Sequence, residues 1–188
     1  AHNAYLHAGG EDAVVHAEVD LLRGAGHEVE LLQRDNAELG SIGAVSAAAQ
    51  TLWSRRTTRD VARLVAGFRP QVVHAHNTFA LISPSLYWAC CEGGIPVVQT
   101  LHNFRLACPQ AMFLREGAIC EDCLGRSPWP AVRHACYRGS RSQTLVMSSM
   151  LMLHRALETW TNRVDRYIAL NAFCRDKFIQ AGLPADRI

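Results

Sequence analysis

Lysine is nearly absent from this sequence: of its 19 basic residues, only Lys177 is a lysine. The net charge is +2, so the chain lacks the concentrated positive charge with which proteins attract nucleic acid. Charged residues make up 19% of the chain and hydrophobic residues 49%, a balance that argues against disorder and predicts a sizeable buried core. We attribute the arginine bias to codon usage rather than to function.

Long apolar runs are also missing. No run approaches the ~20 residues that a helix needs to span a bilayer, and no signal peptide is visible. The chain opens with Ala1 rather than Met, so we expect part of the natural N-terminus to be absent. Seven cysteines, an odd number, without secretory features indicate a reducing compartment. We therefore expect a cytoplasmic protein, with peripheral contact at the inner face of the membrane as an open alternative.

Two common enzyme motifs are absent as well. No G-x-G-x-x-G motif follows the first predicted strand, and no acidic residue is suitably placed after the second, which disfavours a nucleotide-dependent oxidoreductase. No pair of carboxylates has the spacing typical of a glycosidase, so hydrolysis is not favoured either.

What is present is an alternation of strand and helix patterns. Apolar runs bounded by turn residues predict strands at 1–5, 28–33, 72–76, 95–101 and 167–170. Helical spacing predicts helices at 11–24, 61–68, 83–92, 145–160 and 173–181. This order implies right-handed βαβ units and a parallel sheet covered on both faces. We predict a Rossmann-like, doubly wound α/β domain over residues 1–188, with an irregular insertion at 103–140.

Polar residues appear where the predicted strands end. Thr100-Leu101-His102-Asn103 directly follows an apolar run, and ligands bind outside the carboxyl ends of strands in open α/β sheets. Other predicted strand ends carry Asn3, His76 with Asn77, and Asn171. We predict that these side chains share one edge of the sheet. His74 points to the same side of its strand as His76, but we interpret it as a packed structural residue.

The Gly9-Gly10 turn lies between the first predicted strand and helix. Glycines there let a phosphate approach backbone N–H groups at the positive end of the helix. Alternatively, they serve only a backbone conformation with φ above zero. Glu11 and Asp12 would repel a naked phosphate unless they cap the helix or bind sugar hydroxyls, so the pattern favours a sugar diphosphate.

Four cysteines fall within the insertion in the pattern C-x11-C-x2-C-x12-C: Cys108, Cys120, Cys123 and Cys136. Four thiolates in a loop of this length would form a closed structural zinc site. Thiols without a metal, partly oxidised or not, and native disulfides are the alternatives, and His134 could replace Cys136 as a ligand. We expect the three other cysteines to be core residues: Cys90, Cys91 and Cys174.

The sequence resembles the N-terminal domain of a family 4 glycosyltransferase. The resemblance covers nearly the whole chain. It lies in Asn3-Ala4-Tyr5 followed by Gly9-Gly10-Glu11-Asp12, in Gly26-His27-Glu28-Val29, and in the strand ends at 72–77 and 100–103. The cysteine segments at 108–123 and 136–140 are similar to one subgroup of these enzymes.

The resemblance implies one half of a GT-B enzyme, in which two Rossmann-like domains face each other across a cleft. Such enzymes transfer a sugar from a nucleotide-sugar donor to an acceptor, here a glycan or a lipid-linked precursor, with retention and with no catalytic metal expected. Gly9 and Gly10 would approach the donor diphosphate, and His102 would lie at the reacting centre. The acceptor side would hold His76, Asn77, Phe104, Arg105 and Asn171.

The second domain of that family supplies most of the nucleotide-binding surface. The chain ends at Ile188, where the link to that domain would begin, so we expect little transferase activity from these residues alone. The alternative is a non-catalytic Rossmann-like domain that holds an acceptor or a protein partner.

Overall fold

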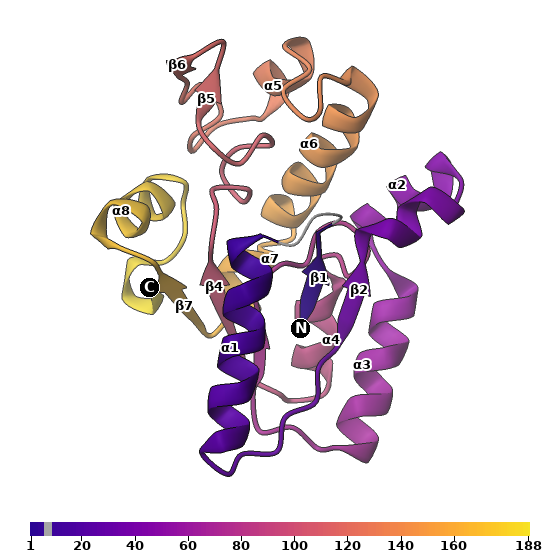
Figure 1. The fold of residues 1–188 in the computed structure, drawn as a ribbon. Helices are drawn as coiled ribbons and strands as arrows, with labels where there is room; N and C mark the ends of the chain where they lie inside the picture. The colour runs from indigo at the N-terminus through magenta and orange to yellow at the C-terminus, as the bar shows by residue number, and fades with distance from the viewer. Residues whose placement is uncertain (6–8) are drawn as a thin grey trace. The chain divides into compact units, whose positions relative to one another are not determined.

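Three short parallel strands organise the first part of the chain. The computed structural model describes residues 1–5 and 9–188, which form two units, Ala1–Val97 and Val98–Ile188. In the first unit, β1 (His2–Ala4) pairs with β2 (Gln33–Asp35) in parallel, and the two strands lie side by side in Figure 1.

The third strand of this unit, β3 (Val73–Ala75), runs along the other side of β1. The His76 N–H donates to the Ala1 carbonyl at 3.0 Å, and the Asn3 N–H donates to the Asn77 carbonyl at 2.8 Å. The residues just after β3 are therefore hydrogen-bonded to β1 and its preceding residue, and β2 pairs with β1.

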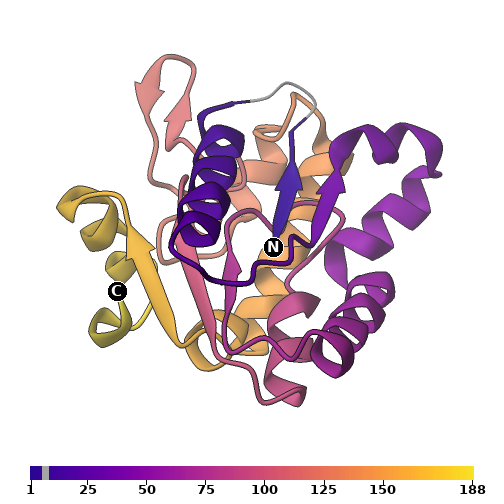
Figure 2. The same ribbon diagram turned by 60° about the horizontal axis from the view of Figure 1, so that its bottom comes forward.

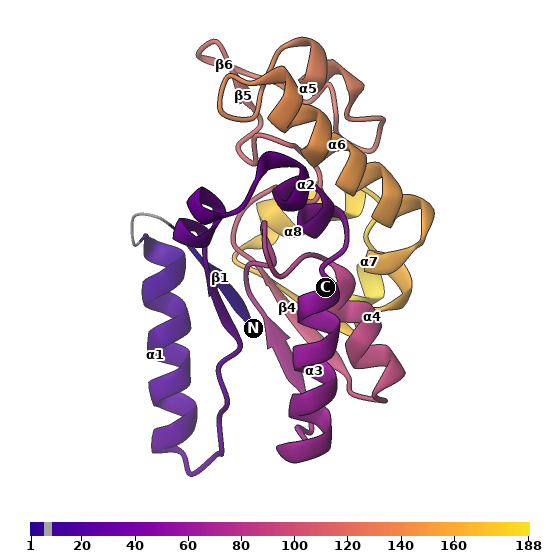
Figure 3. The ribbon, with the colours of Figure 1, turned by 90° about the vertical axis from the view of Figure 1, so that its right-hand side faces the viewer.

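Helices connect these strands in opposite directions. α1 (Gly10–Gly24) leads from β1 to β2, and α3 (Arg55–Gly67) leads back past β1 to β3. Right-handed crossovers in opposite directions place their helices on opposite faces, and Figure 3 shows α1 and α3 on either side of β1. Val15 of α1 and Val61 of α3 are buried. The remaining helices of the unit are η1 (Asn36–Ser41), α2 (Ala44–Leu52) and α4 (Ser85–Glu92).

The second unit contains a parallel pair of its own. β4 (Val97–Leu101) pairs with β7 (Arg166–Ala169), with Leu101 opposite Ala169, and Figure 2 shows the two strands side by side. Its helices are α6 (Arg141–Ala156), α7 (Thr159–Asn162), α8 (Ala172–Gln180) and η2 (Ala185–Arg187). The buried core of the unit includes Met147, Met150, Leu151, Trp160 and Phe178.

The predicted insertion has little regular structure. β5 (Leu114–Arg115) and β6 (Ala118–Ile119) form a two-stranded antiparallel hairpin, and α5 (Trp129–Arg133) is a short helix. Ala107, Cys108 and Phe113 form a small buried cluster beside them.

The predicted α/β class with parallel strands and intervening helices is confirmed, but several element boundaries were wrong. The helix predicted at 61–68, for example, begins at Arg55. The strand predicted at 28–33 begins only at Gln33, because pairing with β1 starts opposite His2. The helix predicted at 145–160 is interrupted at Glu158, whose φ of 52° is incompatible with continuing a right-handed helix. Among residues 1–5 and 9–188, no helix is both long enough and apolar enough to cross a membrane.

Candidate functional site

Gly9 is the N-cap of α1 and Gly10 is its first residue, and both are exposed. Gly9 has a φ of −121°, and Gly10 is not in the left-handed region either. A Cβ on Gly10 would meet no described atom within 4 Å. The alternative that these glycines serve a positive φ is therefore wrong, and the described surroundings do not exclude a side chain at either position.

Asp12 is the residue that caps this helix. Its carboxylate accepts hydrogen bonds from the Gly9 N–H at 2.8 Å and from the Tyr5 N–H at 3.4 Å. The buried His2 ring lies 2.8 Å away through its Nε2. Burial alone would raise the pKa of Asp12, but these hydrogen bonds outweigh it and hold that pKa below its usual value. Asp12 therefore remains an anion that caps α1. Capping is one of the two roles, with the binding of sugar hydroxyls, that would reduce its repulsion of a phosphate.

His2 is held in one neutral tautomer by this arrangement. Its Nε2–H donates to Asp12, and its buried Nδ1 has no hydrogen-bond partner among the residues that the structure describes. Burial lowers the pKa of His2, although its hydrogen bond to Asp12 acts in the opposite direction. An imidazolium at this position would carry a second unpaired N–H, which is costly in the interior.

Asn77, which follows β3, is bound into a buried amide network. Its side-chain nitrogen donates to the Asn3 carbonyl and its side-chain oxygen accepts from the Phe79 N–H, both at 2.9 Å. Asn3 in turn accepts from the Leu81 N–H at 2.9 Å and donates to Asn36 at the same distance. These amides fix the loop at the end of the strand, so Asn77 and Asn3 have a structural part; the predicted acceptor-binding role of Asn77 remains a prediction.

Glu18, His74 and His76 form a cluster that the sequence analysis missed. The Glu18 Oε2 atom lies 3.3 Å from His74 Nδ1 and 3.2 Å from His76 Nε2. All three ligand atoms lie within 4.8 Å of one another, a geometry that could hold a metal ion. Burial raises the pKa of Glu18. A signal was available, because Glu18 lies three residues after the buried Val15 on the same face of α1.

In the second unit, His102 and Asn171 follow neighbouring strands. Because Leu101 lies opposite Ala169, both residues come after the carboxyl ends of β4 and β7 at the same edge. His102 is half-buried. Asn171 is exposed and its Oδ1 accepts from the Cys174 N–H at 2.8 Å, which makes it the N-cap of α8.

Phe104 and Arg105 lie at the start of the insertion. The Phe104 ring packs against Phe113 at 4.7 Å and Phe178 at 5.5 Å between centroids, so most of its contacts stabilise the fold. The Arg105 guanidinium donates to the Pro109 carbonyl at 3.0 Å and lies 5.4 Å from the Tyr137 ring centroid. It is half-buried and positively charged, which suits an anionic acceptor.

The four cysteines of the insertion line one small cavity. No disulfide joins any of the seven cysteines, so the disulfide alternative is not supported by the structure. Burial raises the pKa of the Cys123 thiol to about 11, and its neighbours Cys108, Cys120 and Cys136 add to the shift.

The expectation that Cys91 lies in the core was wrong: it is exposed, because it follows the buried Cys90 by about 100° around α4. Cys174 is half-buried.

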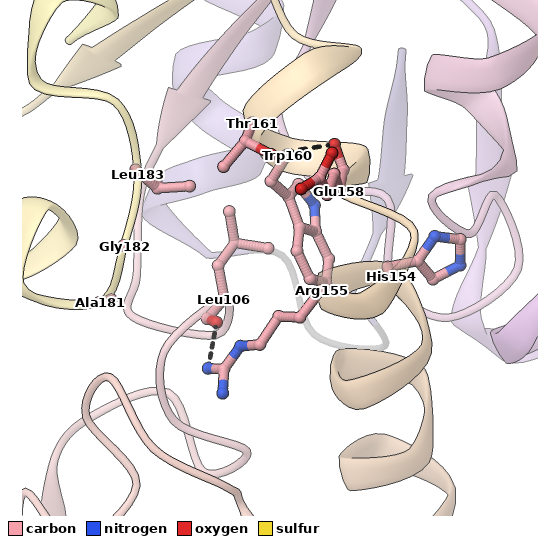
Figure 4. Close-up of a pocket in the computed structure, with 9 residues that line it drawn as sticks. All are labelled: Leu106, His154, Arg155, Glu158, Trp160, Thr161, Ala181, Gly182 and Leu183. Carbon is pink, nitrogen blue, oxygen red and sulfur yellow. Dashed lines mark hydrogen bonds between the residues drawn. The ribbon is translucent and has the colours of Figure 1, made fainter.

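A separate cavity of about 240 Å³ lies between α6, α7 and the segment after α8. Figure 4 shows Arg155 donating to the Leu106 carbonyl across it, at 3.0 Å; a second bond of 2.6 Å reaches the Arg126 carbonyl. Both bonds join α6 to the insertion, so we assign Arg155 a structural role.

The predicted site residues therefore divide between the two units. The first holds Gly9, Gly10, His76 and Asn77, and the second holds His102, Phe104, Arg105, Asn171 and the four cysteines. His76 and Asn77 follow β3, while His102 and Asn171 follow β4 and β7. The predicted convergence of His76 with His102 remains a prediction.

Comparison with known families yields one match. Residues 8–188 match the model of the family described as Glycosyltransferase Family 4. No curated protein and no solved structure matches the chain.

Proposed function

The chain belongs to glycosyltransferase family 4, and from this we propose that it is the acceptor-side, N-terminal half of a retaining GT-B enzyme. The proposed reaction transfers a sugar from a nucleotide-sugar donor to a glycan or lipid-linked acceptor. The observation that carries the proposal is the family match over residues 8–188. The half-buried His102 and the exposed Asn171 at one strand edge support it.

The donor diphosphate is proposed to approach the Gly9-Gly10 turn. The absence of side chains leaves the backbone accessible at the positive end of α1, and α1 is long enough, at 15 residues, to have a substantial dipole. Asp12 already accepts the Gly9 N–H, so the proposed contact is to the remaining open backbone of the turn. A second domain would supply most of the nucleotide surface.

His102 is proposed to act at the donor sugar. As the C–O bond to the leaving diphosphate breaks, positive charge develops on the sugar ring and negative charge on the leaving oxygen. An imidazole N–H placed beside the sugar orients it, while backbone N–H groups and cationic side chains stabilise the leaving group. Preorganised stabilisation of this kind is often worth several kcal/mol.

The acceptor is proposed to lie against Phe104, Arg105 and Asn171 of the second unit, and the acceptor-binding roles of His76 and Asn77 in the first unit remain predictions. Arg105 offers a guanidinium that matches the paired oxygens of a diphosphate, which favours a lipid-linked diphosphate among the acceptor classes. A lipid-linked acceptor would place the reaction at the cytoplasmic membrane surface, and this location is part of the proposal.

The test compares His102→Ala with His16→Ala in the complete enzyme, supplied with its second domain. His16 is an exposed histidine on α1 and serves as the control. A panel of nucleotide sugars first identifies the donor, and release of the nucleoside diphosphate then gives the rate. We expect His102→Ala to lower kcat at least about 100-fold with a smaller change in the acceptor KM. Unchanged turnover would remove His102 from the mechanism, and donor binding without turnover by the complete protein would favour the binding-domain alternative.

A further inference from the structure

We propose that Cys108, Cys120, Cys123 and Cys136 bind one structural zinc ion that holds the insertion together. The proposal is independent of the glycosyltransferase reaction. It concerns a closed site of four thiolates with no position open to a substrate.

The first support is that the fold brings the four residues to one place. Their positions span residues 108 to 136, yet all four line the same small cavity. The C-x2-C pair contributes Cys120 and Cys123, Cys108 comes from the segment before the β5–β6 hairpin, and Cys136 follows α5. Four thiolate ligands favour zinc over magnesium, calcium or manganese, which prefer oxygen ligands.

Backbone hydrogen bonds fix the cysteines in this arrangement. The N–H groups of Cys108, Cys120 and Cys136 donate to the carbonyls of Phe104, Phe113 and Ala131 at 2.8, 2.8 and 3.0 Å, respectively. Ordered backbone at the ligand positions lowers the entropy lost on metal binding.

A cationic group beside the thiols is expected to support thiolates. Arg115 lines the same cavity as Cys120 and Cys136, where its guanidinium would attract the negative charge of a zinc-bound thiolate group. Arg115 also pairs with Asp122 at 2.7 Å, which fixes its position beside the cavity.

The insertion needs such a support because its own core is small. Its regular structure is a hairpin of two-residue strands and a five-residue helix, and a two-stranded hairpin alone is marginally stable in water. Its buried apolar residues are mostly small, and two of them are themselves proposed ligands: Ala107, Cys108, Ala111, Phe113, Cys123 and Ala131. Small apolar cores of this kind are commonly completed by a metal or by disulfides.

A closed zinc site requires the sulfurs to approach one another. Tetrahedral Zn–S bonds of about 2.3 Å place the sulfurs about 3.8 Å apart. Among the residues that the structure describes, only Glu18, His74 and His76 have three ligand atoms within 4.8 Å. Zinc binding by the four cysteines therefore includes rotation of their side chains toward the metal. The experiment must distinguish zinc held by the cysteines from zinc held by Glu18, His74 and His76.

Zinc content of the purified chain is the primary measurement. The 188-residue chain is prepared without chelators, and zinc is counted by elemental analysis beside three variants. Cys120→Ser/Cys123→Ser removes half of the proposed ligands. Cys174→Ser changes a half-buried cysteine outside the cluster, and His74→Ala removes a member of the other group. We expect one zinc per chain in the parent, Cys174→Ser and His74→Ala, and none in the double variant.

The double variant could lack zinc because it does not fold, so a second set of measurements uses the parent chain alone. Cobalt is added to the parent chain after zinc removal, because tetrahedral thiolate cobalt has a characteristic visible absorption and sulfur-to-metal charge-transfer bands. Hydrogen exchange before and after zinc removal should show loss of protection within 104–137 and not in α1 or α3. Absence of zinc and of the cobalt spectrum in the parent would overturn the proposal. So would zinc that survives in the double variant and disappears in His74→Ala, or bound iron in place of zinc.

Discussion

Replacing Asp12 tests the network that organises the start of the first unit. Asp12→Ala removes the acceptor of three groups, the His2 ring, the Gly9 N–H and the Tyr5 N–H. Loss of an N-terminal cap costs about 1 kcal/mol. A buried donor left without a partner costs about 1–3 kcal/mol more, and His2 is 1% exposed. The free energy of unfolding should therefore fall by about 2–4 kcal/mol.

The measurement is urea unfolding at pH 7 followed by circular dichroism, with Asp20→Ala as the matched control. Asp20 lies on the same helix and is exposed, so its replacement should change the free energy of unfolding by less than about 0.5 kcal/mol. Equal effects of the two substitutions would refute the role assigned to the Asp12 contacts.

The pH dependence adds a second check. The pKa of folded Asp12 lies below its ordinary value of 3.8, so its carboxylate binds fewer protons in the folded chain than in the unfolded chain. Its stabilisation is therefore present above pH 3.8 and is lost as the pH falls through the folded pKa. The difference between the parent and Asp12→Ala should narrow in that acidic range. A difference that stays constant from pH 7 to pH 3 would contradict the assignment to an ionised carboxylate.

Two further predictions concern packing and buried ionisation. Gly125→Ala should cost at least about 2 kcal/mol, because Gly125 has a φ of +64° and an added Cβ would lie 2.7 Å from the Gln180 carbonyl oxygen. Gly117→Ala, with a φ of +79° and no described atom within 4 Å of the added Cβ, should cost about 1 kcal/mol in the same unfolding assay, and equal losses would argue against the clash. Burial raises the pKa of the Cys90 thiol from 9.0 to about 12, so the unfolded chain ionises first and stability should fall above pH 9 by up to about 1.4 kcal/mol per pH unit. Cys90→Ala should reduce this alkaline slope, and an unchanged slope would exclude Cys90 as its source.

Helices with a clear apolar stripe were predictable from sequence. Val61, Leu64, Val65 and Phe68 recur at helical spacing, and α3 buries or half-buries all four. The same reasoning placed β4 and β7, which pair in parallel from Val98 opposite Arg166 to Leu101 opposite Ala169. The prediction of β2 from sequence failed at its start. The residues at 28–32 have a strand-like composition, but the paired residues of β1 and β2 begin with His2 opposite Gln33.

Some features of the candidate sites were also predictable from sequence, and others depend on the tertiary structure. The four cysteines marked the insertion as a candidate metal site in the sequence, and the fold brings all four to the same cavity. Glu18 carried no motif of its own, since its significance depends on the packing of α1 against the strand that bears His74 and His76. Asn77 was predictable as a strand-end residue, but its bonds to Asn3 and Phe79 were not.

The sequence by itself determined the α/β class, the order of most helices and strands, and the resemblance to glycosyltransferase family 4. These follow from local periodicity and from short motifs, which act over a few residues. Tertiary structure alone decided the register of β2, the capping partners of Asp12 and the meeting of Glu18 with two histidines. Each of these depends on contacts between residues far apart in the chain, where the burial of a side chain and the satisfaction of its hydrogen bonds are decided together.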